Sequence, residues 1–448
     1  MSWVLKVSEY GKIKSAEIEM APLTLFVGDN NSGKSYLMSL LWGIQNLGTS
    51  AIFIDQYEKN SKEEELLLDW LKTQMEAAWE RGSHTTGVEE IADILQTALN
   101  LRLRRGKDSL VKLIFNSMDV KIKDLEIEIK ELEKVSLKFE ISDGKEEKTL
   151  SIKNNNGTIY GINYSDIEQL NTMARAWIIL LFILVTGIGS GGNIDKSGRI
   201  YLPAARTGFM LTKDIINKVG RNSVFNIDTN KDKIVPFVRP INQFLDVMND
   251  LTFDGKGDEK FNKIALYLEN GMAEGTISMS TLPNREVVYI PEGQESGIPL
   301  RIASAVVTEL SPLILILKHK SDLHTLFYEE PEMCLHPQLQ QKMARVICQL
   351  TNAHLEMVVT THSDIILQHI NNMIRLSKRE DSAEICKQLG YTPDDLLDAN
   401  QVKVYQLKSK PGEKTSVEEL VCGENGFAIP TFNDALDRIL DESYLIQE

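Results

Sequence analysis

The sequence predicts an α/β protein with a mixed, largely parallel sheet, antiparallel strands near its N-terminus, and helical and α+β insertions. Three observations favour this fold class. Residues 3–8 and 13–20 alternate apolar and polar side chains around a turn at Gly11, which predicts an antiparallel hairpin. Residues 23–27 form an apolar strand-like run that is followed by a glycine-rich loop and an apolar helix. Residues 298–363 alternate apolar helices with buried strands, which is typical of a parallel sheet.

The loop after the first buried strand reads Gly-Asp-Asn-Asn-Ser-Gly-Lys-Ser, from Gly28 to Ser35. It is a complete G-x-x-x-x-G-K-[ST] phosphate loop, in which backbone N–H groups and the helix dipole attract phosphate oxygens. Lys34 is expected to reach the β- and γ-phosphates of ATP, and the Ser35 hydroxyl to ligate Mg²⁺. The nucleotide-binding residues predicted from this loop are Gly28, Asn30, Asn31, Ser32, Gly33, Lys34 and Ser35.

The middle of the chain predicts two insertions. The first combines amphipathic helices at 63–80 and 88–103, an antiparallel meander of strands between 125 and 152, and a buried helix at 166–185. The second is mostly helical and is followed by a hairpin of residues 276–280 and 287–290. The predicted organisation is a first head lobe at 1–48, an insertion at 49–198, a return strand at 199–208, a helical insertion at 209–271 and a second head lobe at 272–448.

The second lobe contains an apolar helix at 298–318, a strand at 323–328, a helix at 338–350 and a strand at 355–360. Two acids follow the first strand and a histidine follows the second. We expect Glu329 to hold Mg²⁺ and Glu330 to orient and deprotonate the attacking water. His362 either hydrogen-bonds the γ-phosphate or the catalytic water, or is an ordinary turn histidine. Strands at 402–407 and 417–421 and a helix from Thr431 are predicted to end the chain.

Composition limits the class of protein. The chain has 448 residues, 42% of them hydrophobic and 25% charged, which is typical of a soluble globular protein of two or three substructures. The formal net charge of −15 means that the surface as a whole repels nucleic acid. Four dispersed cysteines without a C-x-x-C pattern suit a reducing compartment. Since the longest apolar run, 176–189, is too short to cross a bilayer, we expect a cytoplasmic protein without a membrane segment.

The order of these motifs resembles a known group of ATPases. Gly28 to Ser35, then Glu329-Glu330-Pro331-Glu332, then Leu335-His336-Pro337, then Thr361-His362-Ser363 looks like the ABC-type ATPase heads of the SMC, RecF and OLD groups. The nearest resemblance is to the standalone OLD-like ATPases of prokaryotic antiphage defence systems. It covers about the first fifty residues and the last hundred and fifty, and the insertions are outside it.

The resemblance implies ATP and Mg²⁺ as cofactors and a head that closes on a second copy of itself. In that group a serine of one subunit caps the γ-phosphate held by the other, and Ser304 is the position that matches best here. Glu329 stands where the wider family usually has a metal-binding Asp. Arg206, at the end of a Tyr-Leu-Pro-Ala-Ala-Arg motif from Tyr201, is expected either to meet a phosphate or to pair with an acid.

Two functions remain open at this stage. The first is an ATP-driven sensor or scaffold that responds to a phage-derived trigger and controls a separately encoded, nuclease-like effector, as in PARIS- or Septu-like systems. It is favoured because no D-x-D strand end of a fused nuclease follows His362. The alternative is a RecF- or SMC-like ATPase of DNA repair or maintenance, for which Arg102, Arg104, Arg105 and Lys107 offer a basic cluster. A transporter ATPase is disfavoured by the degenerate signature around Ser304 and by the large insertions.

Overall fold

A computed structural model describes residues 3–48, 61–143, 148–154, 159–164, 174–186, 198–213, 216, 237–252, 257–280, 286–423, 426–428 and 441–446. The chain divides into two compact units, each of which is described by itself below. Unit 1 contains Met1–Glu19 and Gly43–Asn193, and unit 2 contains Met20–Trp42 and Ile194–Glu448.

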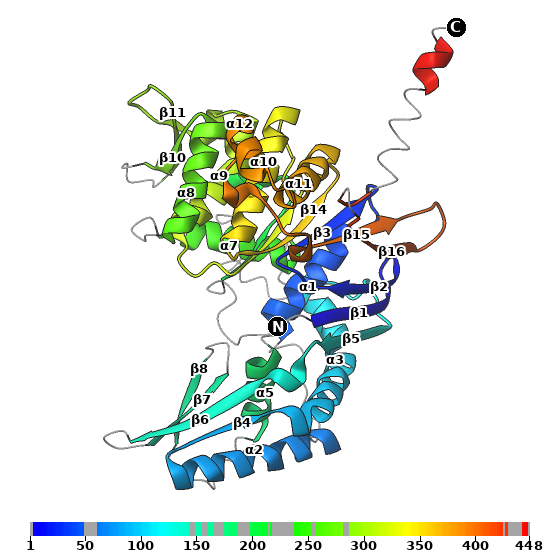
Figure 1. The fold of residues 1–448 in the computed structure, drawn as a ribbon, viewed down its shortest axis with the longest axis vertical. Helices are drawn as coiled ribbons and strands as arrows, with labels where there is room; N and C mark the ends of the chain where they lie inside the picture. Colours follow the sequence, from blue (N-terminus) through cyan, green and yellow to red (C-terminus); the bar gives the residue numbers. More distant parts are fainter. Residues whose placement is uncertain are drawn as a thin grey trace, which may run out of the picture. The chain divides into compact units, whose positions relative to one another are not determined.

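Unit 1 contains two antiparallel sheets with helices beside them (Figure 1). In the first sheet, β1 pairs with β2 on one side and with β5 on the other. In the second, the strand order is β4-β6-β7-β8, and α2 packs on β4, β6, α3 and α5. The strands are β1 (Trp3–Tyr10), β2 (Ile13–Glu19), β4 (Ser83–Gly87), β5 (Asp124–Ile129), β6 (Ser136–Asp143), β7 (Lys148–Asn154) and β8 (Ile159–Tyr164). The helices are α2 (Lys62–Arg81), α3 (Ala92–Phe115) and α5 (Ala174–Thr186), with short turns η2 (Glu89–Ile91) and η3 (Leu132–Lys134).

Several predictions for unit 1 are confirmed, and one strand pairing is wrong. The opening hairpin forms, with Gly11 at a φ of 53° in its turn, and α2 matches the predicted helix. The predicted helix at 88–103 forms as α3, which starts later, at Ala92 after η2, and continues to Phe115. Strand β4 before it was not predicted, because its Ser-His-Thr-Thr-Gly sequence carries no apolar alternation. The strand near residue 125 pairs with β1 and does not join the meander. The first residues of the predicted 166–185 helix lie outside the described part of the chain.

Unit 2 is built on parallel strands in the order β15-β3-β14-β13-β9, with β16 antiparallel to β15. The strands are β3 (Leu23–Gly28), β9 (Arg199–Leu202), β13 (Thr325–Glu329), β14 (Glu356–Thr361), β15 (Val402–Lys408) and β16 (Thr415–Leu420). A separate small sheet contains β10 (Gly275–Met279), β11 (Val287–Pro291) and β12 (Ile298–Pro299). The mixed, mainly parallel α/β class expected from the sequence is therefore confirmed.

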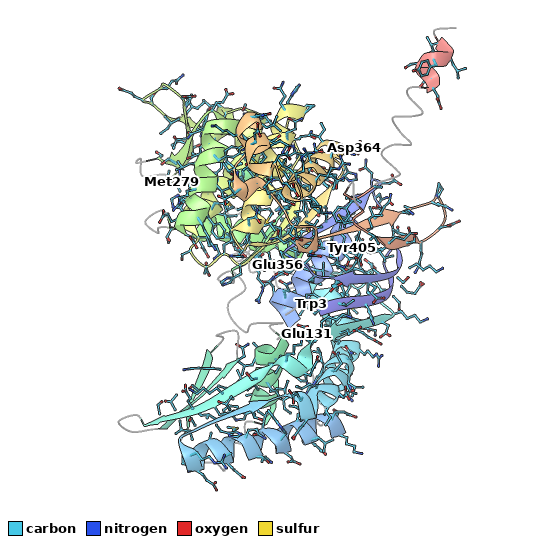
Figure 2. All side chains as sticks on the ribbon, in the orientation of Figure 1. Trp3, Glu131, Met279, Glu356, Asp364 and Tyr405 are labelled. Carbon is cyan, nitrogen blue, oxygen red and sulfur yellow. The ribbon has the colours of Figure 1, made fainter. Side chains whose placement is uncertain are left out.

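The helices of unit 2 cover both faces of this sheet. One set of alternating strand residues, which includes Leu25 and Met357, belongs to a buried core that also contains residues of the helices α7 to α11. The other set includes Phe26 of β3 and Tyr405 of β15, whose rings are in contact. Trp42 of α1 meets Tyr201 edge to face, and side chains fill the space between sheet and helices (Figure 2). The helices are α1 (Lys34–Gly48), α7 (Arg239–Asp250), α8 (Glu259–Leu268), α9 (Ala305–His319), α10 (Pro337–Asn352), α11 (Asp364–Ser377) and α12 (Ser382–Leu389). Shorter helical segments are η5 (Glu269–Ala273), η6 (Leu300–Ile302), η7 (Pro393–Asp395) and η8 (Ala399–Gln401).

The predicted helix at 298–318 starts later than expected. Residues 298–302 form β12 and η6, and α9 begins at Ala305 because Ser304 caps it by accepting a hydrogen bond from Val307 N at 3.4 Å. The predicted start of the terminal helix at Thr431 lies outside the described residues. Within the described residues, none of the helices has the length and apolar character that crossing a bilayer requires.

Candidate functional site

The phosphate loop lies between β3 and α1 in unit 2. Gly28, Asn31 and Gly33 have φ angles of 137°, 61° and 101°, so the backbone turns through left-handed conformations that bring successive N–H groups to one side. At Gly28 an added Cβ would lie 2.2 Å from the Leu407 carbonyl oxygen, which leaves room only for glycine. Asn30, Asn31 and Ser35 are exposed and Ser32 is buried. The sequence therefore folds locally as a loop that a phosphate can enter.

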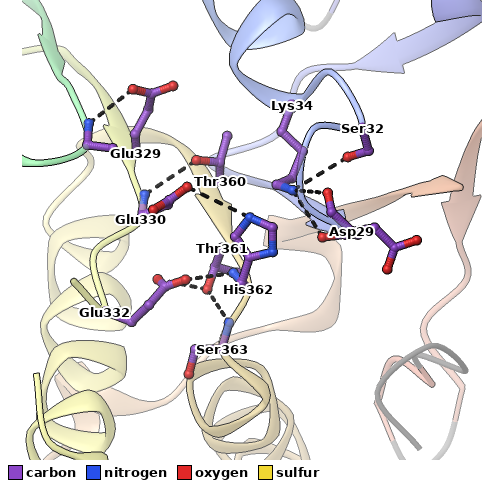
Figure 3. A network of polar contacts seen from close by, with 12 residues as sticks. Asp29, Ser32, Lys34, Glu329, Glu330, Glu332, Thr360, Thr361, His362 and Ser363 are labelled. Atoms are coloured by element: carbon purple, nitrogen blue, oxygen red, sulfur yellow. Dashed lines mark hydrogen bonds and ion pairs between the residues drawn. The ribbon is translucent and has the colours of Figure 1, made fainter. Parts of the chain in front are cut away.

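The Lys34 ammonium curls back over this loop. Its Nζ donates to the carbonyl oxygens of Gly28 at 3.0 Å and Asp29 at 2.8 Å, and the side chain is only 5% exposed (Figure 3). Burial lowers the pKa of Lys34 to about 8, against the opposing effect of Glu330 and other acids. A cation held among carbonyls at the head of a helix is well placed to meet phosphate oxygens.

Sheet register brings the acidic strand end to the same edge. Thr361 of β14 pairs with Val27 of β3, and Glu329 of β13 pairs with Thr360 of β14. Neighbouring strands lie about 5 Å apart, so the loop after β3 and the acids after β13 are separated by roughly 10 Å, with β14 between them. A magnesium triphosphate can bridge such a gap, and Glu330 is the largest of the charges that raise the pKa of Lys34.

Glu330 and His362 face each other at the ends of β13 and β14. Glu330 Oε1 and His362 Nε2 are 3.7 Å apart, and both side chains are partly exposed (Figure 3). Burial, followed by the charge of Glu329, raises the pKa of Glu330 above its ordinary value. Burial and then the charge of Lys34 lower the pKa of His362, so the ring is mainly neutral at neutral pH. The pair combines a strengthened carboxylate base with a neutral imidazole.

Glu332 belongs to the acidic motif that begins at Glu329, but the sequence did not predict what it binds. Its carboxylate accepts hydrogen bonds from His362 N at 2.6 Å and from Thr361 Oγ1 at 2.9 Å. Ser363 then caps α11, and its hydroxyl donates to Gln340 Oε1 at 2.6 Å. These bonds fix the backbone on both sides of His362. In the sequence, the only indication of this role was the presence of an acid, Glu332, three residues after Glu329.

Arg206 was expected to meet a phosphate or to pair with an acid, and the structure shows the second arrangement. The guanidinium is 0% exposed and lies 2.7 Å from Glu309 of α9, which the sequence analysis did not single out. Its NH1 donates to the Glu329 carbonyl at 2.6 Å and its NH2 to the Glu330 carbonyl at 3.1 Å. Because it is enclosed in this way, Arg206 supports the backbone of the acidic strand end.

The residues present fit a magnesium nucleotide. Ser35 offers an exposed hydroxyl at the start of α1, and Glu329 places a carboxylate, which also accepts from Ala204 N at 3.0 Å, at the same sheet edge. Among the described residues no group of three or more His, Cys, Asp or Glu side chains could hold a metal by itself. Magnesium commonly takes one or two protein ligands and completes its shell with water and phosphate, so this sparse set of oxygen donors is appropriate.

The structure also describes Ser304 and the basic cluster at 102–107. Ser304 is exposed at the start of α9, where a partner could reach its hydroxyl. The basic cluster is largely neutralised: Arg102 forms a buried ion pair with Glu64, and Arg104 binds Asp124 and Glu126. Lys107 lies 3.2 Å from the Asp108 carboxylate. Since three of its four charges lie beside acids, this cluster gives only weak support to DNA binding.

Comparisons with known proteins identify the family to which the chain belongs. The AAA ATPase domain family matches residues 4–172 and 209–367. No curated protein matches the chain. Solved structures that resemble it include an SMC head bound to the C-winged helix domain of ScpA, with 12% identity, a TM-score of 0.39, and coverage of 93% of this chain and 97% of that one.

Two other SMC heads resemble the chain at a similar level. The SMC head domain from Thermotoga maritima has 10% identity and a TM-score of 0.32, over 93% of this chain and 97% of that one. The Smc head with an extended coiled coil, bound to the C-terminal domain of ScpA from Pyrococcus furiosus, has 11% identity and a TM-score of 0.38, over 100% of both chains. These three likenesses are weak, whereas the family match spans more than half of the sequence. The chain therefore belongs to the AAA ATPase domain family, and it is an ATPase.

Proposed function

We propose that this ATPase binds Mg²⁺-ATP between the phosphate loop and the acidic strand end, and that nucleotide-dependent closure of two copies controls a separately encoded effector in antiphage defence. The observation that carries the first part is the register of β3, β14 and β13, which sets Lys34, His362 and Glu330 along one sheet edge. The resemblance of the motif order to standalone OLD-like ATPases supports the second part.

Each side chain then has a defined task. Lys34 and the loop amides bind the β- and γ-phosphates, and Glu330 accepts a proton from the attacking water. His362, neutral and 3.7 Å from Glu330, hydrogen-bonds the water or the γ-phosphate. Ser35 and Glu329 would hold Mg²⁺, which supplies charge stabilisation at the phosphates. Ser304 of a second copy caps the γ-phosphate from the other side.

One observation on the sequence supports the proposal of a separate effector. The sequence after His362 has no D-x-D strand end that would indicate a fused nuclease. ATP-driven closure is a two-state element that an external trigger, such as a phage component, can bias. We propose a cytoplasmic setting, which agrees with the four cysteines, all of which are free thiols.

The binding claim is tested with Lys34→Ala. The variant should lose ATP binding in calorimetry and lose hydrolysis, because a buried, loop-held ammonium is removed from the phosphate site. Retention of wild-type affinity would overturn the site assignment. Lys403→Ala, which removes an exposed lysine paired with Glu419, is a matched control.

The defence claim is tested by phage challenge of cells that express this chain with and without its neighbouring gene. Protection should require both genes and should be lost in Lys34→Ala. Full protection by this chain alone would overturn the proposal of a separate effector.

A further inference from the structure

We infer that the buried Arg206–Glu309 pair is a positioning device that holds the Glu330 backbone in the conformation needed for hydrolysis. The inference rests on the proposed function, because it concerns the base of that same site. Three features of unit 2 support it: the conformation of Glu330, the bonds that Arg206 makes around it, and the way Glu309 fixes Arg206.

Glu330 has a φ of 42°, in the left-handed region that a non-glycine residue adopts at a cost. Such a conformation persists only where the surroundings impose it. Part of the support comes from β14, since Glu330 N donates to the Thr360 carbonyl at 2.9 Å. This bond fixes the amide of Glu330, and Met333 N donates to the Glu330 carbonyl at 3.1 Å. The carbonyl groups of Glu329 and Glu330 have a further donor in common.

Arg206 binds both of those carbonyls. NH1 donates to Glu329 O at 2.6 Å and NH2 donates to Glu330 O at 3.1 Å, so one rigid guanidinium spans the peptide group that links the two acids and the carbonyl after it. NH1 also donates to Pro203 O at 2.8 Å, which ties the same group to the end of β9. The planar fork therefore sets the direction in which the Glu330 side chain leaves the strand.

Glu309 completes the arrangement from α9. One carboxylate oxygen lies 2.7 Å from Arg206 NH2, and the other accepts from Thr207 N at 2.9 Å and Thr207 Oγ1 at 2.7 Å. Both members are almost fully buried, at 0% and 2% exposure, and the guanidinium also lies over the Tyr328 ring, 4.8 Å from its centroid. Arg206 Nε makes no hydrogen bond within the described residues, and a buried ion pair of this kind adds directional order more than net stability. Arg206 and Glu309 are thus positioning residues that act through Glu330.

The test is a comparison of kcat and KM for Arg206→Met, Glu309→Gln and the double variant. Misplacement of a catalytic group by about 1 Å can reduce rate about 100-fold, so kcat of Arg206→Met should fall by about that factor. ATP affinity should change by less than about threefold, because the phosphate loop is untouched. Since the two residues act as one unit, the double variant should lose little more than Arg206→Met alone.

Arg206→Lys separates positioning from packing. A lysine keeps the charge opposite Glu309 and so should restore thermal stability, but one nitrogen cannot reproduce the fork over both carbonyls, and kcat should stay at least about tenfold low. Arg345→Met is the matched control: Arg345 pairs with buried Asp395 at 2.9 Å in the same unit and binds neither the loop nor the acidic strand end. It should lower stability and leave kcat of the folded protein unchanged.

The outcomes distinguish this inference from the proposed function. If Lys34→Ala abolishes hydrolysis while Arg206→Met keeps wild-type kcat, the positioning role is wrong and the site assignment stands. If Arg206→Met and Arg345→Met lose kcat equally, the effect is one of general stability and the inference is overturned. If Lys34→Ala hydrolyses ATP normally, the proposed function itself is wrong.

Discussion

At the scale of single residues, Lys34 connects the electrostatics of the phosphate loop to nucleotide binding. Burial desolvates its ammonium and lowers the pKa to about 8, against the opposing charges of Glu330 and other acids. A triphosphate that enters the loop brings negative charge to this ammonium. Since only the charged form attracts that ligand strongly, binding and protonation of Lys34 are linked.

This linkage predicts how ATP affinity depends on pH. Below about pH 8 Lys34 is charged and affinity should be constant, whereas above it affinity should fall by up to about tenfold per pH unit. Calorimetry with a non-hydrolysable ATP analogue between about pH 7 and about pH 9.5 measures the effect. Lys34→Arg, which keeps its charge throughout, should give a flat profile. A flat profile for the wild-type protein would contradict the prediction.

Gly28 is the second residue with a sharp prediction. Gly28→Ala combines a φ of 137° with a contact of 2.2 Å to the Leu407 carbonyl, so it should destabilise the protein by more than about 3 kcal/mol. Gly390→Ala is the control, because Gly390 also has a positive φ, 69°, but nothing lies within 4 Å of the added Cβ. It should cost only about 1 kcal/mol. Similar melting temperatures for the two variants would show that the close approach at Gly28 is not needed.

The sequence predicted candidate site residues better than it predicted the tertiary contacts that hold them in place. The phosphate loop, Glu330 and His362 could be found because short motifs define them locally. The pairing of Arg206 with Glu309 could not, since the two lie far apart in the chain and only tertiary packing brings them together. A signal was nonetheless present, because Glu309 is a lone acid in the apolar run of α9.

At the scale of elements, the position of His362 depends on how α11 begins. Ser363 accepts from Ile366 N at 3.1 Å and donates to Gln340 of α10, so it joins two helices directly after the histidine. An N-cap residue fixes where a helix begins, and the sequence indicates such a residue as Ser or Asp before an apolar run. The start of α9 was predicted too early because Ser304 was read as part of the helix and not as its cap.

Ser363→Ala tests the element scale. Loss of the N-cap should cost about 1–2 kcal/mol in urea unfolding, and the freed loop should also lower kcat because His362 is less well held. Asp258→Ala removes the N-cap of α8, whose side chain accepts from Lys260 N at 3.1 Å, and should affect stability alone. Equal kcat values for the two variants would contradict the proposed coupling of α11 to the site.

Strand pairing marks the limit of prediction at this scale. The apolar alternation near residue 125 correctly predicted a strand, but alternation does not name its partner, and β5 pairs with β1. Strand β4 was missed because Ser83 to Gly87 carry no apolar face, so cross-strand hydrogen bonds to β6 define it. The parallel pairing of β13 with β14, in contrast, was predicted from the alternation of buried strands with helices.

At the scale of the whole molecule, the proposal requires two copies that close on ATP. Ser304 carries two roles in it, as the N-cap of α9 and as the group that meets the nucleotide of a partner. Ser304→Asn keeps a good N-cap but changes the group that faces the partner. It should therefore retain stability while weakening ATP-dependent dimerisation, measured by analytical ultracentrifugation. Undiminished dimerisation with ATP would remove Ser304 from the interface.

The central claim is that the phosphate loop and the acidic strand end act on one nucleotide, and single-turnover hydrolysis by Glu330→Gln tests it most directly. The variant should bind ATP with wild-type affinity, because Lys34 and the loop are intact. Its hydrolysis rate should fall by roughly 10²–10⁴-fold, the usual contribution of a positioned base. Hydrolysis by Glu330→Gln at the wild-type rate would contradict the account.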